Sequence, residues 1–291
     1  MIRISTLKGF EFEHYTTYNE LLTYFKSING YTQYRLKDSY GGLEIWGFSL
    51  GDLNKPTIFI EGQIHSNHEW GTSHWVSRFM ELLVNPNELS QNNIFQHLKA
   101  KYSFYFIPCV NPDGYNRGIN KGSYNDNGVY IDANFDYRWE EYEANGGIYN
   151  KGEYPFSEPE SQNVRDVVNE ILPVCFLDSH CWGGGEGVYI RRPANQSYDT
   201  LLNDYTKSIG ISLPHMKMNY SGANIIPTAY NWAGEIMNKH GRKIIATVLE
   251  TGNTGITQPK LEQSSNALNG ILMFCIYVDH HLKTNELNYK K

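Results

Sequence analysis

Apolar residues follow two different rhythms along this chain. Four stretches of strand length are nearly continuously apolar, as expected for strands that are buried on both faces. These are residues 55–64, 102–110, 174–180 and 243–250. Three other stretches place their apolar residues at helical intervals. These are residues 71–84, 157–172 and 264–282. Strands that alternate with helices over this length predict an α/β fold, with helices on both faces of a mixed sheet.

The first fifty residues predict a helix followed by a hairpin. Thr17 and Glu20 have the spacing of a capping box, and apolar residues continue at helical spacing as far as Ile28. Residues 34–36 and 43–48 are short β-like runs, and the glycine-containing turn between them is typical of a hairpin.

A polar stretch rich in glycine and tyrosine follows the strand predicted at residues 102–110 and continues to Gly152. A stretch of that length without an obvious helix or strand is typical of loops that form an active site. The sequence has no internal repeat and no segment with the composition of a linker. We therefore predict a single catalytic domain over residues 1–291.

Composition and charge narrow the classes of function. The formal net charge of −6 at pH 7 disfavours nucleic acid and anionic membranes as partners, because both require basic surfaces. A neutral or cationic peptide-like substrate suits this charge better, and no obligate protein partner is indicated. The longest apolar run, residues 271–278, is too short to span a bilayer, and the N-terminus lacks the apolar core of a signal peptide. We predict a soluble protein, cytoplasmic by default, with non-classical export or association with a phage left open.

Histidine and glutamate residues stand at the ends of three predicted strands: His65 with Glu69 shortly after it, then His180, then Glu250. Strand ends at one edge of a parallel sheet converge in space even when they are far apart in sequence. Two imidazoles and one carboxylate are ligands of a catalytic zinc that keeps a fourth position for water. His65, Glu69 and His180 are therefore the predicted ligands of one Zn²⁺ ion. Glu250 is the predicted base that takes a proton from the water.

Two nearby side chains have roles that the residues alone leave open. His68 could replace His65 as a ligand, although its place inside the loop favours contact with the substrate or with a ligand. Asp178 stands two residues before His180 and could either orient a histidine or cap the end of the strand.

Taken in this order, the residues resemble a known family, the zinc metallocarboxypeptidases related to pancreatic carboxypeptidase A. The resemblance extends over about residues 14–280. The matching motifs are Ile64-His65 with Glu69-Trp70, Asn111-Pro-Asp-Gly-Tyr115, Pro155-Phe-Ser-Glu-Pro-Glu160 before a helix, His180 at a strand end, and Leu249-Glu250. The resemblance implies an eight-stranded, mixed and mostly parallel sheet between helices, with one catalytic zinc ion. It also implies hydrolysis of a peptide or related amide bond, with Glu250 as the general base.

The sequence departs from the family pattern at the metal motif and at the site for the substrate's carboxylate. The family usually has His-x-x-Glu, whereas this chain has one extra residue between His65 and Glu69. The family also has Asp-x-Asn-Arg-Asn, whose Asn-Arg pair holds the terminal carboxylate of the substrate. The matching segment here is Asp132-Ala-Asn-Phe-Asp136. Asp132 is still expected to orient a zinc-bound histidine, and Asn134 keeps the amide that would bind substrate.

Phe135 stands at the position of the family's arginine, and a phenyl ring cannot replace a bidentate guanidinium. Strict C-terminal exopeptidase action is therefore not predicted. Arg117, Lys121, Arg138 and Arg191 are candidates for the missing charge, of which Arg138 is the closest in sequence. A third departure concerns a tyrosine that the family places over the bound substrate, for which Tyr230 is the candidate.

The leading hypothesis is a zinc-dependent, carboxypeptidase-like metallopeptidase that hydrolyses peptide or amide bonds. Without the arginine, the acidic composition favours a substrate with an amino group, such as a peptidoglycan stem peptide that carries a diamino acid. Two alternatives stay open. One is a zinc-dependent deacylase of amino acids, and the other is a catalytically silent member that binds peptide or cell-wall material.

Overall fold

A computed structural model describes most of the chain. The described residues are 17–65, 69, 71–86, 89–117, 123–144, 149–182, 188–191, 193, 217–218, 227–252 and 261–288. The predicted residues His68 and Lys121 lie outside these ranges, as does the side chain of Arg191.

Within the described ranges, eight strands form one sheet in the order β1-β2-β4-β3-β5-β8-β6-β7. The strands are β1 (Thr32–Arg35), β2 (Trp46–Leu50), β3 (Thr57–Gly62), β4 (Ser103–Ile107), β5 (Cys175–Trp182), β6 (Val188–Arg191), β7 (Lys217–Met218) and β8 (Ile245–Gly252). The four central strands β4, β3, β5 and β8 are parallel. β2 and β6 join this centre in the antiparallel direction. The mixed α/β sheet that the sequence predicts is therefore confirmed.

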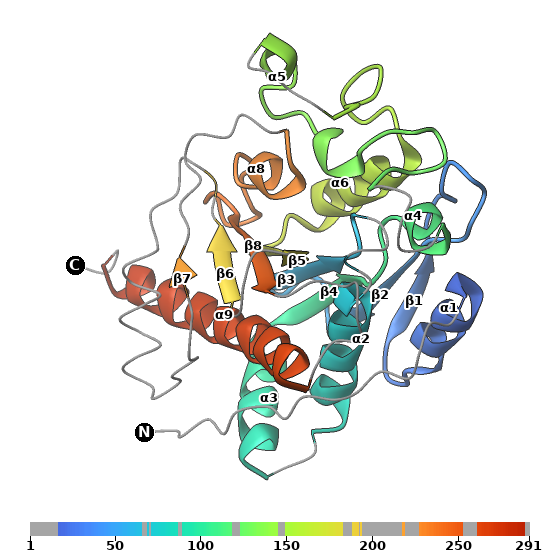
Figure 1. Cartoon of the computed structure of the whole chain (residues 1–291). Coiled ribbons are helices and arrows are strands. Elements are labelled where there is room, and N and C mark those ends of the chain that lie inside the picture. Colours follow the sequence, from blue (N-terminus) through green and yellow to red (C-terminus); the bar gives the residue numbers. More distant parts are fainter. Residues whose placement is uncertain are drawn as a thin grey trace.

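Every residue of the central strands β3 and β4 is buried, because helices cover both faces of the sheet. Alternate residues of β3 enter different cores. Ile58 and Ile60 join the core made with α1 (Tyr18–Ser27), α2 (Gly71–Val84), α3 (Leu89–Lys101) and α9 (Leu261–Asn288). Phe59 joins the second core, made with α6 (Pro159–Ile171) and α8 (Ala229–Ala233). Figure 1 shows these two helical layers on opposite faces of the sheet.

Local signals in the sequence explain several of these elements. The capping box at the start of α1 is present, since Thr17 accepts a hydrogen bond from the backbone of Glu20 and Glu20 accepts one from that of Thr17. β1 and β2 form the predicted hairpin. Short helices occupy the loop region: α4 (Pro112–Asn116), η2 (Ile131–Ala133) and α5 (Glu141–Ala144).

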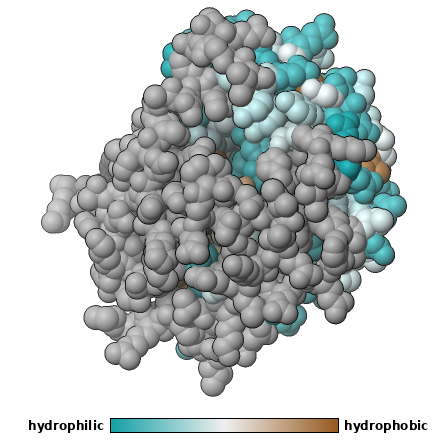
Figure 2. Space-filling model, viewed as in Figure 1, coloured by the Kyte–Doolittle hydropathy of each residue, from teal (hydrophilic) through white to brown (hydrophobic). Residues whose placement is uncertain are grey.

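The surface that the described residues present on the side seen in Figure 2 is mostly hydrophilic, as the mean hydropathy of −0.51 leads one to expect. Among the described residues, the large apolar side chains that are exposed are Tyr40, Tyr154 and Met237. In the described part of the chain, no helix has both the length and the apolar character needed to cross a membrane.

Candidate metal centre

The predicted residues come from neighbouring parallel strands that end at the same edge of the sheet. His180 of β5 and Glu250 of β8 are direct partners in the strand register, so their side chains point to the same face. This is the face covered by α6 and α8, because Phe176 and Val248, at alternate positions of the same strands, belong to that core. His65 lies three residues beyond the end of β3, the other neighbour of β5.

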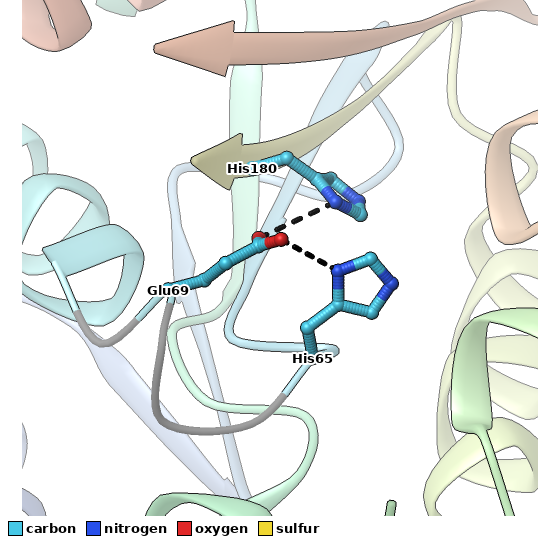
Figure 3. A group of neighbouring side chains, drawn as sticks. All are labelled: His65, Glu69 and His180. Carbon is cyan, nitrogen blue, oxygen red and sulfur yellow. Dashed lines mark hydrogen bonds and ion pairs between the residues drawn. The ribbon is translucent and has the colours of Figure 1, made fainter. Parts of the chain in front are cut away.

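The two predicted histidines, His65 and His180, meet at the carboxylate of Glu69 (Figure 3). Nδ1 of His65 lies 2.7 Å from Oε1 of Glu69, and Nδ1 of His180 lies 3.4 Å from Oε2. The two imidazole rings are nearly perpendicular, with their centroids 4.6 Å apart. One potential ligand atom from each residue lies within 4.8 Å of the others, and all three residues are buried. The backbone N–H of Cys181 donates to Oε2 of Glu69 and helps to hold this carboxylate.

The outer nitrogen of each histidine faces a different buried carboxylate. Nε2 of His65 is 3.4 Å from Oδ2 of Asp132, and Nε2 of His180 is 2.8 Å from Oδ2 of Asp178. The other carboxylate oxygen of Asp132 accepts from the backbone N–H of Ala229. With a metal ion at Nδ1 and the proton on Nε2, these carboxylates would face the imidazoles as they usually do in metal-binding histidines.

The charges at this centre suit a divalent cation. Burial lowers the pKa of His65, but Glu69 and Asp132 raise it well above its usual value. Burial likewise lowers the pKa of His180, whereas Asp178 and Glu69 raise it to about 9. Two protonated imidazoles would balance part of the carboxylate charge. Zn²⁺ carries the same charge as those two protons and accepts this set of two nitrogens and one carboxylate, so the residues fit the ion.

A further carboxyl group, Glu61, lies behind the centre and was not predicted from the sequence. Glu61 is the register partner of Asp178, and neither is exposed. Burial raises the pKa of Glu61, and the neighbouring Asp178 and Asp132 raise it further. Neither carboxyl oxygen of Glu61 has a hydrogen-bond partner among the described residues, which together with burial favours the neutral form of this group.

The space in front of the imidazoles is lined by an aromatic residue that the sequence did not single out. The ring centroid of Tyr130 is 4.9 Å from that of His65, and the ring of Tyr149 stacks on Tyr130 with the centroids 4.1 Å apart. Burial raises the pKa of Tyr130, and the charges of Asp132, Glu69 and Glu250 raise it further. Tyr130 therefore shares one region with the predicted ligands and the predicted base. The tyrosine-rich composition of residues 111–152 was the available signal.

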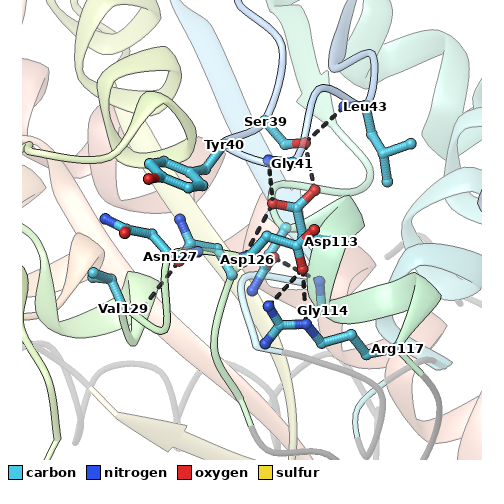
Figure 4. Close-up of polar contacts among 12 residues, drawn as sticks. Ser39, Tyr40, Gly41, Leu43, Asp113, Gly114, Arg117, Asp126, Asn127 and Val129 are labelled. Carbon is cyan, nitrogen blue, oxygen red and sulfur yellow. Dashed lines mark hydrogen bonds and ion pairs between the residues drawn. The ribbon is translucent and has the colours of Figure 1, made fainter.

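The loop that carries Tyr130 and Asp132 is anchored by a polar network around Asp113 (Figure 4). Oδ2 of Asp113 accepts from the backbone N–H groups of Gly41 and Asp126, and Oδ1 accepts from the hydroxyl of Ser39. These contacts join the segment after β1 and the start of α4 to the loop that leads to η2 and Asp132.

Asn134 and Phe135 take part in internal packing. Asn134 is fully buried, and its Nδ2 donates to the carbonyl oxygens of Lys151 and Tyr154 and to the hydroxyl of Ser157. Its Oδ1 accepts from the backbone of Glu158 and the hydroxyl of Ser161 at the start of α6. The Phe135 ring lies 5.5 Å from that of Phe156 and 5.7 Å from that of Trp232. The amide of Asn134 thus joins loops instead of facing the metal centre.

The remaining predicted residues take part in ion pairs or in core packing. Arg117 pairs with Asp126, and Nε of Arg138 donates to Glu141 at 3.0 Å. Tyr230 is buried in α8 within the core beneath α6. The structure therefore brings together His65, Glu69, His180, Asp132 and Glu250, whereas Asn134, Arg117 and Arg138 are engaged elsewhere. Tyr230 follows Ala229, whose backbone N–H donates to Asp132.

Comparison with known proteins also indicates a zinc-binding protein. A family model described as zinc carboxypeptidase matches residues 21–265. The chain is 29% identical over 150 residues to carboxypeptidase B of Astacus astacus, which covers 45% of this chain and 47% of the relative. It is 30% identical over 152 residues to carboxypeptidase B of Helicoverpa zea, with 45% of this chain and 34% of the relative covered. The matched part is thus about half of the first curated relative and a third of the second.

Solved structures share the fold at low sequence identity. Bovine thrombin-activatable fibrinolysis inhibitor, solved in complex with tick carboxypeptidase inhibitor, has a TM-score of 0.72 and 17% identity, and the match covers 93% of this chain and 98% of that chain. The metallo-carboxypeptidase from Burkholderia cenocepacia has a TM-score of 0.65 and 16% identity, with 91% of this chain and 69% of that chain covered.

Proposed function

The chain belongs to the zinc carboxypeptidase family, and on that basis we propose that it hydrolyses peptide or amide bonds at the centre formed by His65, Glu69 and His180. One observation carries the proposal. The Nδ1 atoms of two buried histidines face a single carboxylate, while each Nε2 contacts a different buried carboxylate. Structural ion pairs rarely need two histidines held in this way near the ends of neighbouring strands, whereas a zinc site does.

The residues around the centre have complementary tasks in hydrolysis. Zinc bound there supplies a Lewis acid that polarises a carbonyl oxygen and lowers the pKa of water. Glu250, beside His180 in the sheet, accepts the proton of the attacking water and passes it to the departing amine. Asp132 and Asp178 face the outer nitrogens of the two imidazoles and would favour a proton on Nε2, which leaves Nδ1 for the ion.

The substrate that suits this site need not offer a C-terminal carboxylate. Phe135 is packed in the core, and the described arginines nearest in sequence, Arg117 and Arg138, pair with acidic side chains. The carboxylates of Glu69, Asp132 and Glu250 give the site an acidic character, which attracts an amino group. We therefore propose peptides or amides with a neutral or cationic group near the scissile bond, and peptidoglycan stem peptides with a diamino acid as the class to test first.

The decisive experiment replaces Glu250 by Gln and measures zinc content and hydrolysis together. We expect Glu250→Gln to retain about one zinc per chain and to lose activity by roughly 10²–10⁴-fold, because only the proton acceptor is removed. The wild-type protein should be assayed on a peptide, its C-terminally amidated form and a muropeptide. Unchanged activity in Glu250→Gln would contradict the assignment of the base. Strong loss of activity on amidation would contradict the proposal that the carboxylate is dispensable.

A further inference from the structure

Gln63 has an unusual conformation for a residue with a side chain. It lies between the end of β3 and His65 and is fully buried. Its φ angle is +56°, in the left-handed region that disfavours residues with a Cβ atom. A residue that is held in such a conformation near a functional site usually has contacts that offset the strain.

The side chain of Gln63 connects the two ends of the segment that carries His65 and Glu69. Its Nε2 donates to the backbone carbonyl of His65 at 3.0 Å. Its Oε1 accepts from the hydroxyl of Ser73 at 3.1 Å, in the first turn of α2. The backbone N–H of Gln63 also donates to Oγ1 of Thr72 at 2.9 Å. One residue therefore joins the main chain at His65 to the start of the helix that follows Glu69.

The backbone of Gln63 is held from a third side. Its carbonyl accepts from the backbone N–H of Asn111 at 2.9 Å, and the amide of Asn111 donates to the carbonyl of Ile64. Rotation of this segment is thus opposed by α2 and by the residue that caps α4. Metal ligands must be positioned to within a fraction of an ångström, so a brace at this place affects the ligands on both sides of it.

We propose that Gln63 is a positioning residue of the metal centre, whose side-chain amide fixes the distance between His65 and Glu69 and so determines the affinity for zinc. This inference rests on the proposed function. The left-handed backbone directs the amide between His65 and α2, which explains why a strained residue with a long polar side chain stands where glycine would have no strain.

The test replaces Gln63 by Met, which has a similar volume but makes neither hydrogen bond. We expect the dissociation constant for zinc, measured by competition with a chelating dye, to rise by about 10–100-fold. Ser73→Ala provides a second variant, since it removes only the far end of the brace, and we expect a smaller rise in the same direction. This variant keeps the proposal open to contradiction if Gln63→Met does not fold.

The matched control is Asn163→Ala. The buried amide of Asn163 also connects two segments, through the backbone N–H and carbonyl of Lys37, but it contacts none of the predicted ligands. We expect Asn163→Ala to lower the melting temperature and to leave zinc affinity within about twofold of wild type. This result would show that a general loss of stability does not by itself weaken zinc binding. A loss of zinc affinity in Gln63→Met would then be due to the lost hydrogen bonds of Gln63. Folded Gln63→Met with wild-type zinc affinity would overturn the inference alone. A wild-type protein that binds no zinc would overturn the proposed function and, with it, this inference.

Discussion

At the scale of single residues, the centre divides into groups that face the predicted ion and groups that hold them. Asp178 and Glu61 make this division testable, because they are register partners on β5 and β3 and are equally buried. Only Asp178 contacts a predicted ligand, through Nε2 of His180 at 2.8 Å. Two neighbouring carboxyl groups are therefore expected to differ in their effect on zinc binding.

Asp178→Asn should weaken zinc binding by about 10–100-fold, because a neutral amide attracts the outer nitrogen of the His180 imidazole less strongly than a carboxylate does. Glu61→Gln is the matched control, since it replaces a buried carboxyl group by an amide of the same size at a position that contacts no predicted ligand. We expect its zinc affinity to stay near that of wild type. Equilibrium dialysis of both variants against a zinc buffer provides the measurement. An equal loss in both variants would contradict the division.

Asn134 shows why the sequence could predict only part of the site at this scale. Its motif suggested contact with substrate, because the residue type and its distance from Asp132 match the family pattern. The partners of its amide lie at Lys151, Ser157 and Ser161, some 17 to 27 residues away in sequence. Contacts over such distances depend on the folded loops, and no local pattern encodes them.

At the scale of helices and strands, strong hydrophobic patterns predicted the elements well. β3, β4, β5 and β8 coincide with continuous apolar runs, and the ends of three of them carry or lead to His65, His180 and Glu250. α3 was not predicted, because its buried residues Ile94, Phe95 and Leu98 stand among many polar ones. The order of the strands could not be derived from periodicity, because pairing depends on contacts between segments that are distant in sequence.

The first turn of α6 gives a prediction at this scale. Glu160 is buried, accepts from the backbone N–H of Tyr40 and from the amide of Asn125, and so connects α6 to the loops beside the centre. Burial raises its pKa to about 8. The folded protein therefore retains a proton that the unfolded chain has lost. The contribution of Glu160 to the free energy of unfolding is therefore fully present below about pH 4.5, and it is lost as the pH rises towards 8.

Glu160→Gln should reduce this pH dependence, since an amide does not titrate. We expect the free energy of unfolding of the wild type to fall, relative to that of the variant, by a few kcal/mol between pH 5 and about 9. Urea denaturation at several pH values measures the difference, and the exposed Glu153→Gln serves as the control. Parallel pH profiles for the wild type and Glu160→Gln would mean that Glu160 is ionised throughout.

At the scale of the whole molecule, the two faces of the sheet have separate tasks. Apart from Glu69, which precedes α2, and the contacts of Gln63 with the first turn of α2, the metal centre lies on the face of α6 and α8, whereas α3, α9 and the rest of α2 cover the opposite face (Figure 1). This separation follows from strand geometry, since alternate residues of β5 point in opposite directions. Stability can therefore be changed on the α9 face with little effect on the centre.

Asp279 of α9 is the residue with which to test this separation. Its side chain is buried and accepts from His97, Lys101 and Tyr102 at 3.0 to 3.1 Å, and from Lys283 at 2.6 Å, which ties α9 to the end of α3. Burial alone would raise its pKa, but the hydrogen bonds from Lys283 and the others lower it far more. Asp279 therefore stabilises the fold above about pH 4, and this contribution is lost as the pH falls below that value.

Asp279→Asn should lower the free energy of unfolding at pH 7 by about 1–2 kcal/mol, a moderate value because the lysine partners are largely exposed to solvent. The difference from wild type should shrink as the pH falls from about 4 towards 2, because the unfolded chain binds a proton at Asp279 before the folded protein does. Thermal melts across this range measure the first effect, and zinc competition at pH 7 measures whether the centre responds. If zinc affinity fell together with stability in this variant, the two faces of the sheet would be coupled, and the effects expected of Gln63 and Asp178 on zinc could no longer be separated from those of general stability.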